Sequence, residues 1–247
     1  MATPRFARVA AATALGADTR LLEFDLLAEE ALGFSGGQYV IVDSGLVLPS
    51  GKAAKRAYSI LSPDAEQGRF TLCSKRIPGG LVSGFLHDVA VGTEVKFSGP
   101  WGKLLPAEGA ASHTLVLATD TGITAAIGLC SGRRFAPLLA GTILLWLRPT
   151  PGYFLPEAFV RARLPEGLGS VAIESLPAID HPERLPWVRA RVGDLMRAPG
   201  LGQAFVAGDG AVNYALLDDL QAAGVPATRD NVESFFNMPK KTSTGAA

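Results

Sequence analysis

Three side chains in the segment Arg56-Ala57-Tyr58-Ser59 could together hold a planar, phosphate-bearing cofactor. The ring of Tyr58 could cover one face of an isoalloxazine, and the hydroxyl of Ser59 could form a hydrogen bond with its edge. Arg56 could bind a phosphate. Side chains alternate along a strand, so Arg56 and Tyr58 share one side and Ser59 lies on the other. Taken alone, the pattern is more typical of a strand that binds nothing.

A glycine-rich segment further along the chain has the composition of an anion-binding helix start. It consists of Gly79, Gly80, Leu81, Val82 and Ser83. A helix that begins here would present free backbone N–H groups and its positive end to an anion, and the Ser83 hydroxyl would add a donor. The alternative is a helix that merely follows a turn.

A third segment, Thr121-Gly122-Ile123-Thr124, follows a continuous apolar strand and opens a helix. A doubly wound sheet presents its ligand crevice at this position. The segment therefore predicts a second ligand-binding loop.

The elements that position these segments change character along the chain. Up to about residue 105, short β-like runs alternate with Gly, Pro and Asp clusters, as in an antiparallel barrel or sandwich. The expected strands are 6–12, 19–27, 38–43, 56–61, 69–75 and 94–98, with one short helix at 81–89. From residue 113 onward, fully apolar strands alternate with helices, which is typical of a parallel sheet covered on both faces. The expected strands there are 113–118, 142–147, 171–175 and 204–207, and the expected helices are 124–130, 156–163 and 212–223.

These patterns predict a β + α/β fold. An N-terminal antiparallel β-barrel is expected over residues 1–107, followed by a C-terminal doubly wound parallel-sheet nucleotide-binding domain over residues 108–247. Residues 239–247 contain Lys, Thr, Ser, Gly and Ala and are expected to form a tail that is disordered or lies on the surface.

Composition narrows the classes of partner. With 23 basic and 23 acidic residues the formal net charge is zero, so no global field favours nucleic acid or an anionic membrane. No stretch approaches the ~20 apolar residues of a membrane span, and the N-terminal alanine run is interrupted by Thr13. We expect a cytoplasmic protein with no membrane span.

The metal-ligating residues are few and scattered. Cys73 and Cys130 are far apart, and the three histidines lack ligand spacing, so no metal site is predicted. An iron–sulfur cluster takes four cysteine-type ligands, so any such centre used by this chain is expected on another protein.

Further motifs join these segments in a fixed order. The series comprises residues 34–40, 56–62, 75–83, 99–102, 118–124, 206–210 and 233–236. This ordered series resembles the ferredoxin–NADP reductase family of flavoenzymes, over essentially the whole chain through Phe236.

The resemblance implies FAD on the barrel and NADPH or NADH on the α/β domain. The cofactor-binding residues that it implies are Arg56, Tyr58, Ser59, Lys75, Gly79, Gly80, Leu81, Val82, Ser83, Thr121, Gly122, Thr124, Arg148, Arg191, Gly208, Asp209, Phe235 and Phe236. The catalytic residues that it implies are Tyr58, Ser59 and Glu233.

The chain departs from the family pattern at two loops. Thr119-Asp120 stands where relatives carry Gly-Gly, which is expected to place a carboxylate beside the nucleotide pyrophosphate and weaken its binding. The alternative is that Asp120 caps the following helix. Ala207 stands where relatives often carry a cysteine close to the reacting nicotinamide, and a slower or differently tuned enzyme is expected.

Arg148 and Arg191 fall where some relatives hold the adenosine phosphate of NADPH. The Ser-Arg pair expected between them is replaced by Glu174-Ser175. The choice between NADH and NADPH stays open on these grounds.

The resemblance implies an oxidoreductase that takes hydride from NAD(P)H and passes electrons to a separate ferredoxin, flavodoxin or oxygenase component. A basic rim of Lys52, Lys55, Lys75 and Arg76 could dock such a carrier, or it could be an ordinary solvated surface. Two alternatives remain: a flavin or ferric reductase acting on a small molecule, and an electron-relay or regulatory flavoprotein subunit with impaired nucleotide binding.

Overall fold

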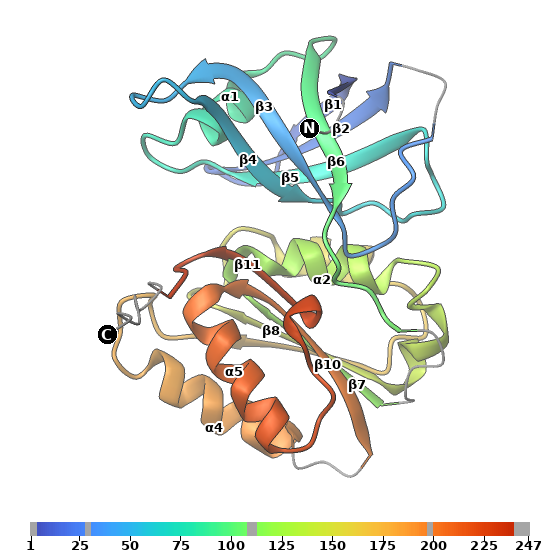
Figure 1. Cartoon of the computed structure of the whole chain (residues 1–247), viewed down its shortest axis with the longest axis vertical. Helices are drawn as coiled ribbons and strands as arrows, with labels where there is room; N and C mark the ends of the chain where they lie inside the picture. Colours follow the sequence, from blue (N-terminus) through green and yellow to red (C-terminus); the bar gives the residue numbers. More distant parts are fainter. Residues whose placement is uncertain (1–3, 28–30, 108–112, 197–199, 240–247) are drawn as a thin grey trace, which may run out of the picture.

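The computed structural model describes residues 4–27, 31–107, 113–196 and 200–239. Two domains are stacked along the long axis of the molecule, and each contains one sheet (Figure 1). The upper domain has a six-stranded antiparallel sheet, and the lower domain has a five-stranded parallel sheet.

The N-terminal sheet curls around its own core. Its strands are β1 (Arg5–Ala14), β2 (Thr19–Leu26), β3 (Tyr39–Val47), β4 (Ala53–Ser59), β5 (Arg69–Lys75) and β6 (Glu94–Trp101), in the order β4-β3-β6-β1-β2-β5. Leu61, just after β4, donates its N–H to the carbonyl of Thr71 on β5 at 2.9 Å, which joins the two ends of the sheet. Phe24 and Phe70 stack inside it with ring centroids 5.0 Å apart. Helix α1 (Leu81–Asp88) lies between β5 and β6 in the chain.

The C-terminal sheet has helices on both faces. Its strands are β7 (His113–Thr119), β8 (Thr142–Arg148), β9 (Ser170–Ser175), β10 (Leu201–Asp209) and β11 (Val232–Phe236), in the order β11-β10-β7-β8-β9. The helices are α2 (Ile123–Cys130), α3 (Glu157–Arg163), α4 (Arg184–Met196) and α5 (Gly210–Ala222), with 3₁₀ turns η1 (Asp120–Gly122), η2 (Ala136–Gly141) and η3 (Arg229–Asn231). Six of the seven residues of β7 are buried, as expected for a strand covered on both faces.

The predicted fold class is confirmed: an antiparallel β domain precedes a doubly wound α/β domain. The sequence patterns missed α4 and β11. The predicted boundary between residues 107 and 108 adjoins a segment outside the described residues, and nearly all of the predicted tail also lies outside them. Both stay predictions.

The two domains pack closely through glycines. A Cβ at Gly128 of α2 would lie 2.1 Å from the carbonyl oxygen of Ile60, and one at Gly36 would lie 2.3 Å from the carbonyl oxygen of Gly128. The buried carboxylate of Asp64 accepts the N–H of Gly36 and the N–H of Arg133 at 3.0 Å each. This contact fixes the edge of the barrel next to β4 against the α/β domain.

No helix in the described part of the chain is long and apolar enough to cross a membrane.

Candidate functional site

Strand β4 presents its chemistry-bearing side chains close to the domain interface. Tyr58 is half-buried against the barrel core, and burial raises the pKa of its phenol. Ser59 is only 5% exposed, and its Oγ has no hydrogen-bond partner among the described residues. A buried hydroxyl without a partner is costly unless a ligand satisfies it. The Oγ is also shielded from solvent, so the edge of a flavin can meet it only if the side chain turns or its neighbours move.

The start of α1 opens onto a hollow of about 430 Å³. Its N-cap is Gly80, which offers no side-chain cap, so the first N–H groups of the helix are free for an anion. Gly79 has φ +71°, a conformation that glycine adopts without strain. Ser83 is turned inward: its Oγ accepts the N–H of Ile77 at 3.1 Å and lies 3.2 Å from the carbonyl of Gly80. Backbone groups are therefore better placed than the Ser83 hydroxyl to hold a phosphate here.

Lys75, at the end of β5, bridges the two domains. Its Nζ pairs with Asp18 and lies 4.7 Å from the ring centroid of Tyr153, which follows β8. The pairing with Asp18 lowers the pKa of that carboxyl. Lys75 thus lies at the domain interface, and its positive charge is paired with the carboxylate of Asp18.

The last strand, β11, lies on the side of the lower domain that faces the barrel (Figure 1). Arg56 of β4 donates a hydrogen bond to the carbonyl oxygen of Phe235 at 2.9 Å. Phe235 packs partly against the core cluster that contains α2, and Phe236 pairs with Asp209 at the end of β10. Arg56 and Phe235, each expected to contact the cofactor, are therefore in contact with each other.

Glu233 of β11 is the most strongly perturbed carboxyl at this interface. Burial raises its pKa to about 7, and its negative charge, after burial itself, raises the pKa of Tyr39. A Cβ at Gly102 would lie 3.0 Å from the Tyr39 ring and 3.6 Å from Glu233 Oε2, which places the three residues together. Tyr39 is also the sheet partner of Ser59. Glu233 thus lies beside Tyr39, whose partner in the sheet is Ser59 of β4.

The loops that follow β7 and β10 touch at the carboxyl edge of the parallel sheet. A Cβ at Gly122 would lie 2.2 Å from the carbonyl oxygen of Ala207, and one at Gly208 would lie 2.1 Å from that of Thr119. The hydroxyl of Thr124 donates to the carbonyl of Thr121 at 3.0 Å. Gly122 and Gly208 are thus required for the two loops to pack against each other, independently of any contact with a nucleotide.

The expectation that Asp120 faces a bound pyrophosphate is wrong, and so is the alternative that it caps a helix. Its carboxylate is buried and pairs with Arg184, whose Nε donates to Asp209 Oδ2 at 2.9 Å. Burial raises the pKa of Asp120 to about 6, partly offset by Arg184. No side chain caps η1 or α2.

Asp209 was expected to contact the nucleotide, but its side chain is fully buried. Besides Arg184, its carboxylate accepts the N–H of Ala211 at 3.0 Å and the amide of Asn237 at 2.8 Å. It therefore caps α5 and holds the network of Asp120, Arg184 and Asp209 together. Arg184 itself was missed from the sequence, as was Tyr39.

The remaining predicted arginines are paired with carboxylates. Arg148 is buried and pairs with Glu157, and Arg191 pairs with Glu174. The basic rim is also largely matched, because Lys55 pairs with Asp43 and Arg76 with Asp88, in addition to the pairing of Lys75. Among the described residues, no group of three or more His, Cys, Asp or Glu side chains could hold a metal ion.

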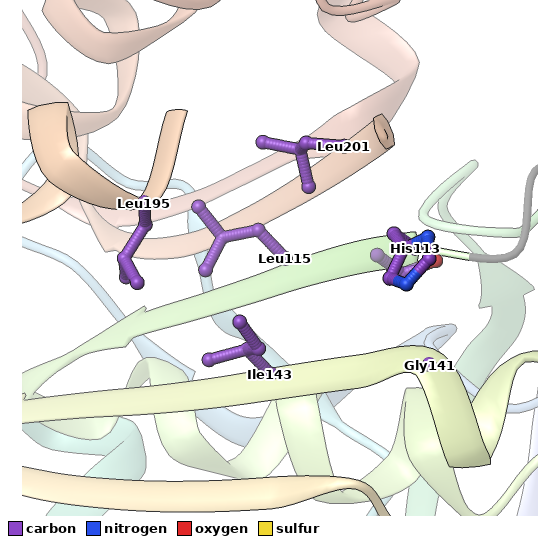
Figure 2. A pocket seen from close by; sticks show the side chains of 7 residues that line it. His113, Leu115, Gly141, Ile143, Leu195 and Leu201 are labelled. Atoms are coloured by element: carbon purple, nitrogen blue, oxygen red, sulfur yellow. The ribbon is translucent and has the colours of Figure 1, made fainter. Parts of the chain in front are cut away.

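A second cavity, of only about 40 Å³, lies at the amino ends of β7 and β8, opposite the predicted nucleotide crevice. Figure 2 shows Leu115, Ile143, Leu195 and Leu201 pointing toward one another around it. An apolar space of this size has room for about one water and few polar partners for it. It is a packing gap and not a ligand site.

These features together define a class of protein. A β domain with an uncapped helix start and an unpaired buried hydroxyl faces a doubly wound sheet, as in two-domain nucleotide-dependent flavoproteins. Residues 7–105 match the family described as the oxidoreductase FAD-binding domain. The match lies within the N-terminal domain, and the resemblance of the chain to the ferredoxin–NADP reductase family is confirmed.

Curated relatives agree with this assignment. Ferredoxin–NADP reductase B of Sorangium cellulosum is 37% identical over 124 residues, which cover 50% of this chain and 49% of that protein. The ferredoxin reductase component of 3-ketosteroid-9-alpha-monooxygenase of Mycolicibacterium smegmatis is 26% identical over 236 residues, 90% of this chain and 62% of that protein. The chain thus spans about half the length of the first of these relatives and less than two thirds of the second.

Solved structures share the fold. The Amycolatopsis cytochrome P450 reductase superposes with a TM-score of 0.72 at 21% identity, covering 97% of this chain and 72% of that one. The cytochrome b5 reductase domain of Ulva prolifera nitrate reductase gives 0.70 at 18% identity, with 94% and 97% coverage. Both domains therefore adopt a known two-domain arrangement.

Proposed function

We propose that this chain is an FAD-dependent oxidoreductase that takes hydride from NAD(P)H and passes electrons to a separate carrier or oxygenase component. The observation that carries the proposal is the uncapped start of α1, which opens onto a hollow and lies beside the strand that carries Arg56 and Tyr58. The match of residues 7–105 to an FAD-binding domain supports the same cofactor.

Each half of the molecule has a distinct task in this proposal. Tyr58 covers a face of the flavin ring, and the free N–H groups at the start of α1 hold the pyrophosphate. The Ser59 hydroxyl, which is shielded from solvent in this structure, donates to the edge of the ring once its side chain turns. The loops after β7 and β10 receive the nicotinamide nucleotide. Bound FAD would supply the change from two-electron to one-electron transfer, which no side chain can perform.

Glu233 is suited to handle a proton at this interface. Because its pKa is raised to about 7, its carboxyl can hold or release a proton near neutral pH. Tyr39 lies beside it and next to Ser59 in the sheet, so the proton would be held close to the proposed flavin edge.

The acceptor is proposed from the relatives and from the cysteine count. The monooxygenase reductase components named among the relatives work in systems of several parts, as their names state. Two cysteines cannot supply the four ligands of an iron–sulfur cluster, so a cluster in the electron path would lie outside these 247 residues.

Flavin content and reduction test the proposal directly. The purified chain is expected to bind about one FAD in preference to FMN, because the start of α1 offers pyrophosphate contacts that FMN uses only in part. Acid release with chromatography identifies the flavin, and anaerobic stopped-flow mixing with NADH and with NADPH measures its reduction. Recovery of FMN alone, or of no flavin after reconstitution, contradicts the barrel assignment. A bound FAD that neither nucleotide reduces favours an electron-relay subunit.

Substitutions on β4 separate binding from reduction. Ser59→Ala is expected to retain FAD but slow its reduction, because it removes the one hydroxyl proposed to meet the reacting edge of the flavin. Tyr58→Ala is expected to loosen FAD and shift its absorption spectrum, because a stacked ring contributes burial worth roughly 1–3 kcal/mol. Flavin dissociation constants and single-turnover rates report the two effects. An unchanged reduction rate in Ser59→Ala removes that residue from the catalytic set.

A further inference from the structure

The two loops proposed to receive the nucleotide are joined by one buried cluster of charges. β7 and β10 are neighbours in the sheet; after β7 the chain builds β8 and β9 on one side, and after β10 it builds β11 on the other. The ligand crevice of a doubly wound sheet lies at such a point. Asp120 follows β7, Asp209 ends β10, and Arg184 of α4 pairs with both carboxylates. All three side chains are at most 5% exposed, so solvent screens their charges poorly.

This cluster carries an unbalanced charge. With both carboxylates ionised, two negative charges meet the one positive charge of Arg184, which leaves a net charge of −1. The loop after β8 adds Tyr153, whose phenol stays neutral, because burial and then the charge of Asp120 raise its pKa to about 12. Beyond Tyr153, Lys75 of the flavin domain is paired with Asp18. An anionic diphosphate that binds beside the cluster therefore meets an excess of negative charge.

Asp120 is the carboxylate of the cluster that accepts a proton more easily. Asp209 accepts hydrogen bonds from Arg184 Nε at 2.9 Å, from the N–H of Ala211 at 3.0 Å and from the amide of Asn237 at 2.8 Å. Three donors stabilise its ionised form. Within the described part of the chain, the carboxylate of Asp120 accepts a hydrogen bond from Arg184 alone, and burial raises its pKa to about 6. A proton that enters the cluster is therefore expected on Asp120.

We propose that Asp120 is a proton-binding site linked to the nucleotide: when a nicotinamide nucleotide binds, the Asp120 carboxylate takes up a proton from solvent. This inference rests on the function proposed above. The proton converts the carboxylate to a neutral carboxyl group, so the cluster becomes neutral while Arg184 keeps its bond to Asp209. The diphosphate then meets no excess of negative charge. Because linkage is reciprocal, the nucleotide binds more tightly as the pH falls.

The pH range of this effect follows from Asp120. Its pKa is about 6 in the free chain, and a bound diphosphate raises it further, because an added negative charge favours the neutral form. The dissociation constant of the nucleotide is therefore low and constant in acid, rises as the pH passes upward through about 6, and becomes constant again above the higher pKa of the complex. The two plateaus are expected to differ roughly tenfold, as for unit charges ~10 Å apart in a partly buried site.

Titration calorimetry with ADP-ribose measures the linkage without turnover. ADP-ribose carries the diphosphate of the nucleotide, but it has no nicotinamide and no phosphate that titrates near neutral pH. Titrations of the FAD-saturated chain in buffers with different enthalpies of ionisation give the number of protons bound with the ligand. Uptake of about half a proton per site is expected near pH ~6.5, which is the uptake that a tenfold change in affinity implies. Binding is expected to be roughly tenfold tighter at pH ~5 than at pH ~8.5.

Two substitutions locate the proton. Asp120→Asn keeps the shape of the side chain and makes the cluster neutral at every pH. This variant is expected to bind ADP-ribose with the affinity of the acid plateau, without proton uptake and without dependence on pH. Glu233→Gln is the matched control, because Glu233 at the domain interface also has a raised pKa, of about 7. Its proton uptake with ADP-ribose is expected to equal that of the unmodified chain.

The outcomes separate this inference from the proposed function. Failure of ADP-ribose to bind, release of a proton, or binding without proton exchange overturns the inference. Uptake that persists in Asp120→Asn, or that disappears in Glu233→Gln, also overturns it, because the proton then lies elsewhere. If Asp120→Asn does not fold, the uptake and its pH profile in Glu233→Gln decide the assignment. If ADP-ribose binds with the expected uptake but neither NADH nor NADPH reduces the FAD, the proposed function fails while the proton site stands.

Discussion

Replacing Arg184 by methionine is expected to lower the free energy of unfolding by about 3–5 kcal/mol, because it leaves two buried carboxylates without their cation. Asp120 and Asp209 both pair with this guanidinium, and their side chains are 5% and 0% exposed. Arg184 also donates to the carbonyl of Pro177 at 2.6 Å, so the same substitution releases the segment before α4. Chemical denaturation measures the loss.

The loss is expected to depend on pH. The pKa of Asp120 is raised on folding from 3.8 to about 6, so this carboxyl contributes stability that is present below 3.8 and is lost as pH rises through about 6. Without Arg184 the pKa rises further, because that guanidinium lowers it in the intact network. The penalty of Arg184→Met is therefore expected to be smaller at about pH 5 than at about pH 8. Asp120→Asn in the same background is expected to recover part of it.

The matched control is Arg189→Met on the same helix. Arg189 pairs with Asp219, but its side chain is 47% exposed, so its loss is expected to cost less than about 1 kcal/mol. Equal losses for the two variants, with no pH dependence for Arg184→Met, would show that the buried network does not stabilise the fold.

A strand could be predicted from the sequence where its hydrophobic pattern matches the burial of its faces in the structure. β7 is an unbroken apolar run because helices cover both of its faces. β5 lies between Gly68 and Pro78-Gly79, which are residues typical of turns. α4 was missed because Pro186 lies inside it and only Val188 and Val192 supply buried apolar side chains. β11 was missed because it is a half-buried edge strand of five residues.

The motifs of the candidate site could be located from the sequence, but the charge pairing of their side chains could not. Arg56, Ser59 and the α1 start were chosen from local composition together with the order of the motifs along the chain. Asp120 finds its partner 64 residues away, on a helix whose existence the sequence pattern does not indicate. Whether a carboxylate faces a ligand or a buried arginine is decided by such distant packing, so the role of Asp120 could not be derived from the sequence.

Replacing Gly128 by alanine is expected to disturb the domain interface and, through it, flavin reduction. The new Cβ would lie 2.1 Å from the carbonyl oxygen of Ile60, the residue after Ser59, so α2 and the end of β4 have to separate. In an unobstructed helix the same change would stabilise by up to about 1 kcal/mol. Here a net loss of about 1–3 kcal/mol is expected, because the overlap is with backbone that cannot rotate away.

The effect on reduction is expected to exceed the effect on stability. The proposed flavin strand and the nucleotide loops belong to different domains, and a misplacement of about 1 Å can cost on the order of a hundredfold in rate. Single-turnover reduction by NADH, with FAD saturating, measures this effect, and a melting curve measures the stability. Gly152→Ala serves as the control, because nothing lies within 4 Å of its added Cβ. If Gly128→Ala reduces its FAD at the rate of that control despite a lowered melting temperature, the glycine contact holds the domains together without setting the distance between the two cofactors.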